Sequence, residues 1–263
     1  MGLLLTASLV WIAHQTPSIQ APAGFKRIDL NYVPFELESW LKVSQVRGKL
    51  SIQTYEQYNA QEQSEWRQVK PSDVLEVKVG DRLSKIQLGK GSRVIEGEMF
   101  PIDMGEWGGG IAFISRGTKK ATPINWRNTQ AVEQFSTGVY AVQALSHLGF
   151  WYSDLVKLTR MRNVWQAKVV TNLHVIPKGI SRIDNHFVIF ADDYVTTLNL
   201  DGTQKELHRL EMLGSRCYNM TILSNGQIWL GADFGVVCLT PRKDHTYDEY
   251  HFVPINAKRK SNT

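Results

Sequence analysis

The chain has few of the features that would assign a function directly. Among its 263 residues there are only two cysteines, and its net charge of +5 comes without any long basic run. The first fact allows one disulfide at most, and the second argues against a nucleic-acid partner. The sequence also lacks His-x-His and His-Glu-x-x-His spacings, a nucleophile elbow and a well-spaced carboxylate pair. Motifs alone therefore point to no catalytic site.

The N-terminus lacks charge. Residues 1–23 contain no Lys, Arg, Asp or Glu, and the apolar stretch from Leu3 to Ala13 is too short to span a membrane. Ala21 and Ala23 are small residues at the positions that a signal peptidase reads. We predict a signal peptide over residues 1–23, cleaved after Ala23, and a periplasmic or secreted protein with no membrane span after cleavage. The usual positive n-region is missing, which leaves an uncleaved anchor or a misassigned start as alternatives.

What the chain does have is an internal repeat. Two copies, beginning at residues 181 and 220, each contain four strand-like runs joined by tight turns such as Asp184-Asn185 and Asn225-Gly226. Matching landmarks lie 41 positions apart: Phe187 and Ile228, Asp192 and Asp233, Leu198 and Leu239. A period near forty with four strands per copy predicts the blade of a β-propeller. The second strands are almost wholly apolar and should be buried. In the fourth strands apolar residues alternate with charged ones, so these strands should form the outer, partly solvated edge of each blade.

A third copy precedes these two. VYAVQA matches a second strand, LVKLTR a third and WQAKVV a fourth, and Leu158 lies 40 positions before Leu198. Its connection ALSHLGFWYSD, residues 144–154, is predicted to be a long loop in place of a tight turn. We predict one all-β domain over residues 24–257, a single propeller of about six four-stranded antiparallel blades with five possible, followed by a basic, solvated tail at residues 258–263.

The N-terminal third shows the repeat less clearly. KLSIQTY, VLEVKV and RLSKIQL read as strands, and the Gln-rich segment YNAQEQSEWRQVKPSD between the first two reads as a long loop or an outer-strand insertion. The glycines at 108–110 permit close backbone approach, as a crowded propeller axis requires, but they lack the strand-then-helix context of a phosphate loop.

The two cysteines fall on the last copy. Cys217 lies just ahead of its first strand and Cys238 on its third, with the second strand between them. Strands ~4.8 Å apart would separate the pair by roughly 10 Å, beyond disulfide reach. We favour two buried or half-buried thiols over a disulfide.

The sequences of several segments resemble those of known propeller proteins. STGVYAVQALSHL, DLVKLTR, IPKGISRIDNHFVIFADDYVTTLNLDG and YNMTILSNGQIWLGADFGVVCLTP resemble bacterial exported proteins with propeller-type repeats and no assigned activity. They are more distantly similar to the gluconolactonase and strictosidine-synthase-like propellers. The resemblance covers Trp107 to Pro254 and bears on fold more than on activity, because one fold hosts many functions.

Propeller geometry predicts where a site would lie. Connections between second and third strands, and from one blade to the next, open on one face, which we call the loop face. Aromatic residues beside mixed charges there would suit a sugar, a peptide or a protein surface. The residues on these connections are His147, Trp151, Tyr152, Asp154, His174, Lys178, Asp192, Asp193, Arg216, Asn219 and Asp233.

Each of these residues also has a simpler role. The aspartates are typical turn residues that hydrogen-bond their own backbone. Isolated histidines are more often structural or solvated than metal ligands. Trp151 and Tyr152 could pack the long connection onto its own blade, and Arg216 could pair with a turn aspartate.

We predict a monomeric binding or interaction module without a cofactor, whose partner is an unknown protein or glycan. An alternative follows from the lactonase-like resemblance, which implies a divalent cation such as calcium in the central channel and a metal-dependent hydrolase. The candidate ligands would then be Glu211, Asn219, Asp192, Asp193 and Asp233, with Glu106 a more distant choice. A second alternative is an inhibitor or immunity-type partner of a secreted protein.

Overall fold

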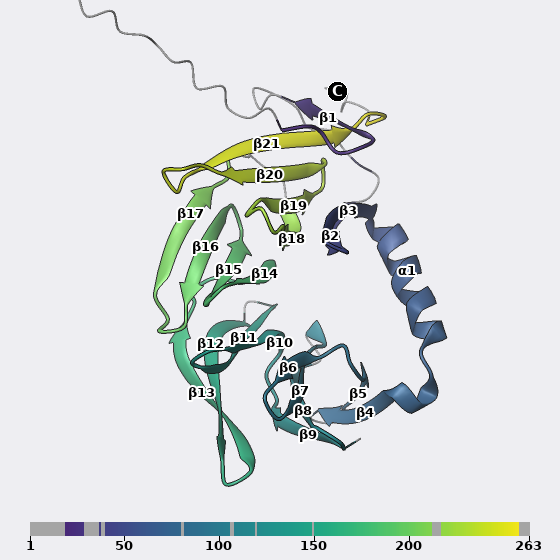
Figure 1. The fold of residues 1–263 in the computed structure, drawn as a ribbon, viewed down its shortest axis with the longest axis vertical. Helices are drawn as coiled ribbons and strands as arrows, with labels where there is room; N and C mark the ends of the chain where they lie inside the picture. Colours follow the sequence, from purple (N-terminus) through teal and green to yellow (C-terminus); the bar gives the residue numbers. More distant parts are fainter. Residues whose placement is uncertain are drawn as a thin grey trace, which may run out of the picture.

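The computed structural model describes residues 19–28, 37, 40–79, 82–105, 108–118, 120–148, 150–211 and 217–257. In this part of the chain six antiparallel sheets follow one another around a central axis (Figure 1). Consecutive strands pair within each sheet, as expected for propeller blades. The predicted all-β propeller is therefore confirmed.

Four of the six sheets are complete blades: β6–β9, β10–β13, β14–β17 and β18–β21. Their bounds are β6 Ser92–Val94, β7 Gly97–Asp103, β8 Gly109–Ser115, β9 Ala121–Asn125, β10 Thr129–Phe135, β11 Gly138–His147, β12 Phe150–Met161, β13 Val164–Asn172, β14 Gly179–Ile183, β15 His186–Ala191, β16 Tyr194–Asn199, β17 Gln204–Arg209, β18 Cys217–Ile222, β19 Ile228–Ala232, β20 Val236–Pro241 and β21 Tyr247–Pro254.

The forty-residue period corresponds to real structural equivalence. In each of the last three blades the repeated leucine lies on the third strand, opposite an apolar residue of the second: Leu158 opposite Val139, Leu198 opposite Phe187, and Leu239 opposite Ile228. All six side chains are buried. Phe187 to Ala191 on β15 are fully buried, whereas most of β17 is exposed, so the predicted inner and outer strands are confirmed.

The first two sheets depart from the prediction of four-stranded blades. β2 (Leu41–Val46) pairs only with β3 (Lys49–Thr54), and β4 (Val74–Val79) pairs only with β5 (Arg82–Gln87). Helix α1 (Tyr55–Gln68) and a short 3₁₀ turn, η1 (Pro71–Asp73), connect the two hairpins. In the first third of the propeller, two half-blades and a helix therefore stand in place of two full blades (Figure 1).

The prediction of a long loop or an outer-strand insertion at residues 58–73 was wrong, because local signals favour a helix over most of this segment. Thr54 caps the N-terminus: its hydroxyl accepts from the Gln57 backbone, and the Gln57 side chain accepts from the Thr54 backbone. Gln61 then donates to Glu65 one turn further on, at 2.9 Å. No residue of α1 is buried, so the apolar periodicity that usually reveals a helix is missing.

The N-terminal strand closes the ring from outside. β1 (Phe25–Ile28) pairs antiparallel with β21 and adds a fifth strand to the last blade, with Phe25 opposite Pro254 and Ile28 opposite His251. These hydrogen bonds join the first and last strands of the described chain. The last blade therefore cannot separate from the N-terminal segment unless the β1–β21 ladder breaks.

A second closure lies on the inner side, at Asn219 on β18. Its side-chain oxygen accepts from the Val43 backbone at 2.8 Å, and its side-chain nitrogen donates to the Leu41 carbonyl at 3.1 Å. Gly231 on β19 allows this approach, since a Cβ there would lie 2.1 Å from the Leu41 oxygen. One amide thus satisfies backbone groups of β2 that have no neighbouring strand on that side.

Both cysteines are free, as favoured from the sequence. Cys217 lies on β18 and Cys238 on β20, with β19 between them. Both are buried, and burial raises the pKa of each thiol to about 12. They behave as small apolar core residues rather than reactive nucleophiles.

Several predicted segments lie outside the described residues: the signal peptide up to residue 18, the tail 258–263, Arg216 and Glu106. In the part that is described, no helix is long and apolar enough to cross a membrane.

Replacing Asn219 by alanine would leave the Val43 N–H and the Leu41 carbonyl without their side-chain partner. We expect the free energy of unfolding, measured by urea denaturation, to fall by about 1–3 kcal/mol. Asn199→Ala removes a bond to Thr203 in an exposed turn and serves as the matched control, within about 0.5 kcal/mol of wild type. Equal losses for the two variants would show that Asn219 does not hold the ring closed.

Candidate functional site

The most distinctive feature of the loop face is the β11–β12 hairpin. The two strands continue beyond the blade, with Leu145 opposite Tyr152, Ser146 opposite Trp151 and His147 opposite Phe150. The prediction of a long loop at residues 144–154 was therefore wrong. Aromatic residues favour extended backbone, and cross-strand pairing extends the ladder to a tight tip at Leu148, which has φ of 44°.

The tip of this hairpin is apolar and exposed. Leu148 is 92% exposed, Phe150 64% and Trp151 48%. Adjacent large apolar side chains in water are uncommon on a monomer and typically mark a contact surface. Because both arms of the hairpin are hydrogen-bonded, the tip is presented on a stiff support.

A network of polar groups fixes the base of the hairpin. Asp154, which is buried, accepts from Arg127 at 2.7 Å and from Asn172 at 3.2 Å. The Arg127 guanidinium also lies over the Tyr152 ring, 5.0 Å from its centroid. The carboxylate and the ring orient Arg127, while about half of its side chain stays exposed. Sequence reasoning missed Arg127 because it lies on the β9–β10 connection, distant in sequence from its partners.

Tyr152 joins this network through its hydroxyl, which accepts from the Asn128 backbone at 2.8 Å. Burial raises the pKa of Tyr152, and the bond from Asn128 and the charge of Arg127 partly offset that effect. The phenol therefore stays protonated at neutral pH, and its own proton can be donated outward.

Two buried oxygen atoms near the base have no partner among the described residues: Oδ1 of Asn128 and Oγ of Ser153. The Asn128 amide nitrogen donates to the Gly105 carbonyl, and the side chain packs against Gly109, where a Cβ would lie 2.2 Å from Oδ1. This contact requires glycine at position 109, because a Cβ there would clash with Asn128.

The remaining predicted residues are spread around the rim. His174 is exposed at positive φ, and its backbone donates to Asn172 at 2.9 Å. Lys178 pairs with Asp192 at 3.4 Å. His147 lies at the hairpin tip, where it forms the last pair of the ladder with Phe150.

The candidate metal ligands are engaged with different neighbours. Arg209 binds both oxygens of Asp193, at 2.9 and 2.8 Å. Asn219 is used in ring closure, and the Asp233 carbonyl accepts from the Leu37 backbone. Glu211 is exposed at the end of the described segment. Within the described ranges, no three His, Cys, Asp or Glu side chains form a group that could hold a metal ion.

A second buried polar cluster was not predicted. Glu249 on β21 accepts from His251 of the same strand at 2.6 Å, from His208 on β17 at 2.7 Å and from the Glu211 backbone at 3.2 Å. The side chain is 4% exposed. Burial alone would raise the pKa of this carboxyl, but the two histidines and the backbone donor lower it to about 2. The cluster joins the outer strands of two blades.

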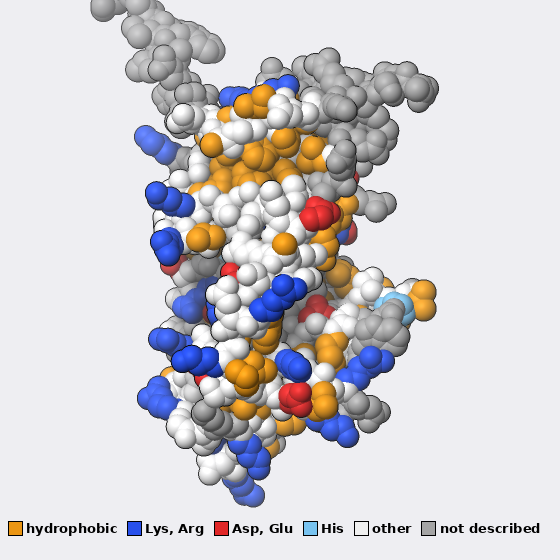
Figure 2. Space-filling model, turned by 90° about the vertical axis from the view of Figure 1, so that its right-hand side faces the viewer, with side chains coloured by type: hydrophobic (Ala, Val, Ile, Leu, Met, Phe, Trp, Pro, Cys, Tyr) orange, Lys and Arg blue, Asp and Glu red, His pale blue; other side chains and the backbone are white. Residues whose placement is uncertain are grey.

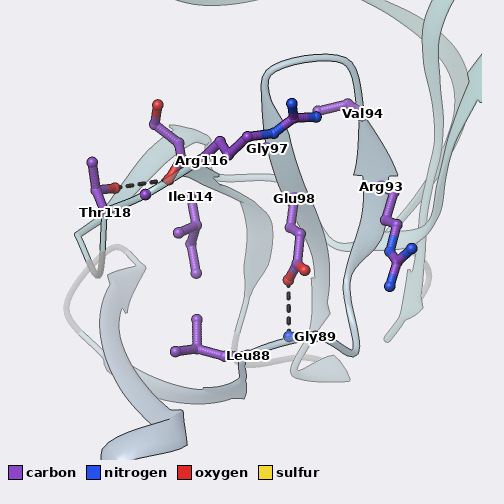
Figure 3. A pocket seen from close by; sticks show the side chains of 11 residues that line it. Leu88, Gly89, Arg93, Val94, Gly97, Glu98, Ile114, Arg116 and Thr118 are labelled. Carbon is purple, nitrogen blue, oxygen red and sulfur yellow. Dashed lines mark hydrogen bonds between the residues drawn. The ribbon is translucent and has the colours of Figure 1, made fainter.

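A hollow of about 420 Å³ lies on the opposite face, between the β5–β6 connection and the β6–β7 and β8–β9 turns (Figure 3). Two of its charged side chains are bound to the protein's own backbone. Glu98 accepts from Gly89 at 2.9 Å, and Arg116 donates to the Ile95 carbonyl at 3.1 Å. We therefore assign no ligand to it.

No protein-family model matches the chain, and no curated protein matches its sequence. One solved structure with a similar course is selenomethionine-substituted virginiamycin B lyase from Staphylococcus aureus. It is 10% identical, the match covers 89% of this chain and 90% of that chain, and the TM-score is 0.35. We draw nothing about activity from similarity at this level, and the propeller assignment rests on the sheets described above.

The Glu249 cluster predicts acid sensitivity. Its carboxyl has a pKa of about 2 in the folded protein against an ordinary value near 4.3, so its stabilisation is complete above pH ~4.5 and is lost as the pH falls toward 2. We expect the difference in unfolding free energy between wild type and Glu249→Gln to shrink by about 3 kcal/mol across that window. Glu206→Gln, at an exposed pair with Arg209, is the control. A difference independent of pH would contradict the prediction.

Proposed function

We propose that the chain is an exported, non-catalytic binding module that docks a protein partner on its loop face. The observation that carries this proposal is the β11–β12 hairpin, which presents Leu148, Phe150 and Trp151 to solvent on a hydrogen-bonded support. Burying such side chains against a partner would contribute favourable free energy at little entropic cost, because the backbone that carries them is already ordered.

Arg127 would supply the polar part of the contact. It lies at the base of the hairpin, its guanidinium is oriented by Asp154 and Tyr152, and much of it remains exposed. Arginine and tryptophan are the residue types that dominate measured interface energetics. We therefore place the contact on this hairpin and its base, with His174 and Lys178 toward the rim. Asn219 is not part of the proposed surface, since it holds the ring closed.

The metal-dependent hydrolase is the less favoured alternative. A cation would have to compete with Arg209 for Asp193 and with Lys178 for Asp192. An inhibitor or immunity role is compatible with the proposed surface and differs only in the partner. A glycan in place of a protein on this face is a further alternative, but the apolar tip fits a protein surface better.

The proposal is tested by a pull-down from periplasmic extract with Phe150→Ala/Trp151→Ala. The matched control is Met161→Ala/Val164→Ala, which truncates two exposed apolar side chains at the β12–β13 tip on the opposite face. We expect wild type and control to retain the same partner and the hairpin variant to lose it, with a change in affinity of about tenfold or more. Retention by all three proteins would contradict the proposal. Stabilisation by calcium that Asp192→Asn abolishes would favour the hydrolase.

Export is tested through the mass of the protein recovered from the periplasm, which we expect to begin at Gly24. Ile19 and Ala21 pack against the cluster around Leu41 and Trp229, and cleavage after Ala23 would remove those contacts. A recovered chain that retains residues 1–23 would contradict the predicted cleavage.

A further inference from the structure

Helix α1 has an unusual relationship to the propeller. It bridges the two half-blades at one side of the ring (Figure 1), yet none of its residues is buried. Its inward side chains, Tyr58, Gln61, Glu62, Glu65 and Trp66, follow helical spacing and line a cleft of about 340 Å³. A surface helix normally packs an apolar stripe onto the core. Here the middle of the inward stripe is polar, with Gln61, Glu62 and Glu65 between two aromatic residues.

The polar side chains along this stripe are already ordered. Gln53 on β3 donates to Gln61 at 2.7 Å, and Gln61 donates to Glu65 at 2.9 Å. The relay uses Oε1 of Glu65, and Oε2 is available as an acceptor. Planar amide and carboxylate groups held in a row can each engage two neighbouring hydroxyl groups.

Aromatic rings stand at the two ends of the stripe. The Lys42 Nζ lies over the Tyr58 ring, 3.2 Å from its centroid. Trp66 is 40% exposed, and in the described part of the chain no other ring or cation stacks on it. Phe100 and Pro101 on β7 provide apolar surface on the opposite wall.

The charges that line the cleft balance. Glu62 and Glu65 on α1 and Lys85 and Lys90 from the β5 side line the cleft in equal number, and Lys85 also pairs with Glu76 at 3.9 Å. Figure 2 shows the side of the molecule on which α1 lies: polar atoms cover much of its middle, hydrophobic side chains gather toward the top, and Lys and Arg are spread along it.

We propose that the α1 cleft binds a neutral saccharide of one or two rings. A sugar ring has an apolar C–H face, which would stack on Trp66, and an equatorial rim of hydroxyls, which would bond to Gln61 and Glu65. The volume lies at the small end of the ~300–1,000 Å³ typical of ligand pockets. The proposal is independent of the loop-face function, because the two sites share no residue.

The test uses three neutral disaccharides, cellobiose, maltose and N,N′-diacetylchitobiose, with binding measured by calorimetry and saturation-transfer NMR. We expect at least one to bind wild type with an affinity that does not change with salt. Trp66→Ala and Gln61→Ala should each weaken it by about tenfold, equivalent to ~1.4 kcal/mol. Trp126→Ala removes an equally accessible tryptophan, 55% exposed, outside the cleft, and should bind as wild type does.

The melting temperature of each variant is measured as well. We expect it to equal that of wild type, because the truncated side chains are exposed. The proposal is overturned if none of the three disaccharides binds, or if Trp66→Ala binds as tightly as wild type. It is also overturned if Trp126→Ala alone loses binding, which would place the sugar on the loop face.

Discussion

Ring closure is the constraint on which this structure depends. A single blade cannot bury both faces of its inner strands, so each relies on the neighbouring blade: one core cluster combines Val188 and Phe190 of β15 with Met220 of β18 and Leu230 of β19. Such packing is useful only if the ring does not open. The chain secures it twice, with a backbone ladder between β1 and β21 and with the Asn219 amide on the edge of β2. The second closure needs Gly231, because any side chain there would displace β2.

The first third of the ring meets this constraint with fewer strands per blade than the rest. Two hairpins provide inner surface for the neighbouring blades, and a capped helix spans the distance between them. Because α1 connects rather than covers, its inward face need not be apolar. A ring of full blades would fill this space with strands, whereas here the same position leaves a cleft lined by ordered polar groups and aromatic rings.

On the loop face a regular blade is lengthened, whereas in the first third of the ring the blades are reduced to hairpins. The β11–β12 ladder continues past the sheet and is anchored at its base by Asp154, Arg127 and Tyr152. Rigid support makes exposed apolar residues usable for binding, since a partner need not order the backbone. Glu249 with its two histidines plays a different part. It ties the outer strands of adjacent blades together through charge-assisted hydrogen bonds, away from the contact surface.

The sequence by itself determined the propeller, because alternation, turn dipeptides and a period near forty are local signals that recur in each copy, and Leu158, Leu198 and Leu239 occupy equivalent positions. It also determined that Cys217 and Cys238 stay apart, since strand order fixes their separation. It did not reveal α1, which has no buried apolar stripe, nor the extended hairpin, whose pairing depends on partners across the turn. Only the tertiary structure decided that Asn219 closes the ring and that Arg127 meets Asp154. Hydrogen bonds between distant segments leave no periodic trace in a sequence, because each depends on where the backbone places two residues and not on their neighbours along the chain.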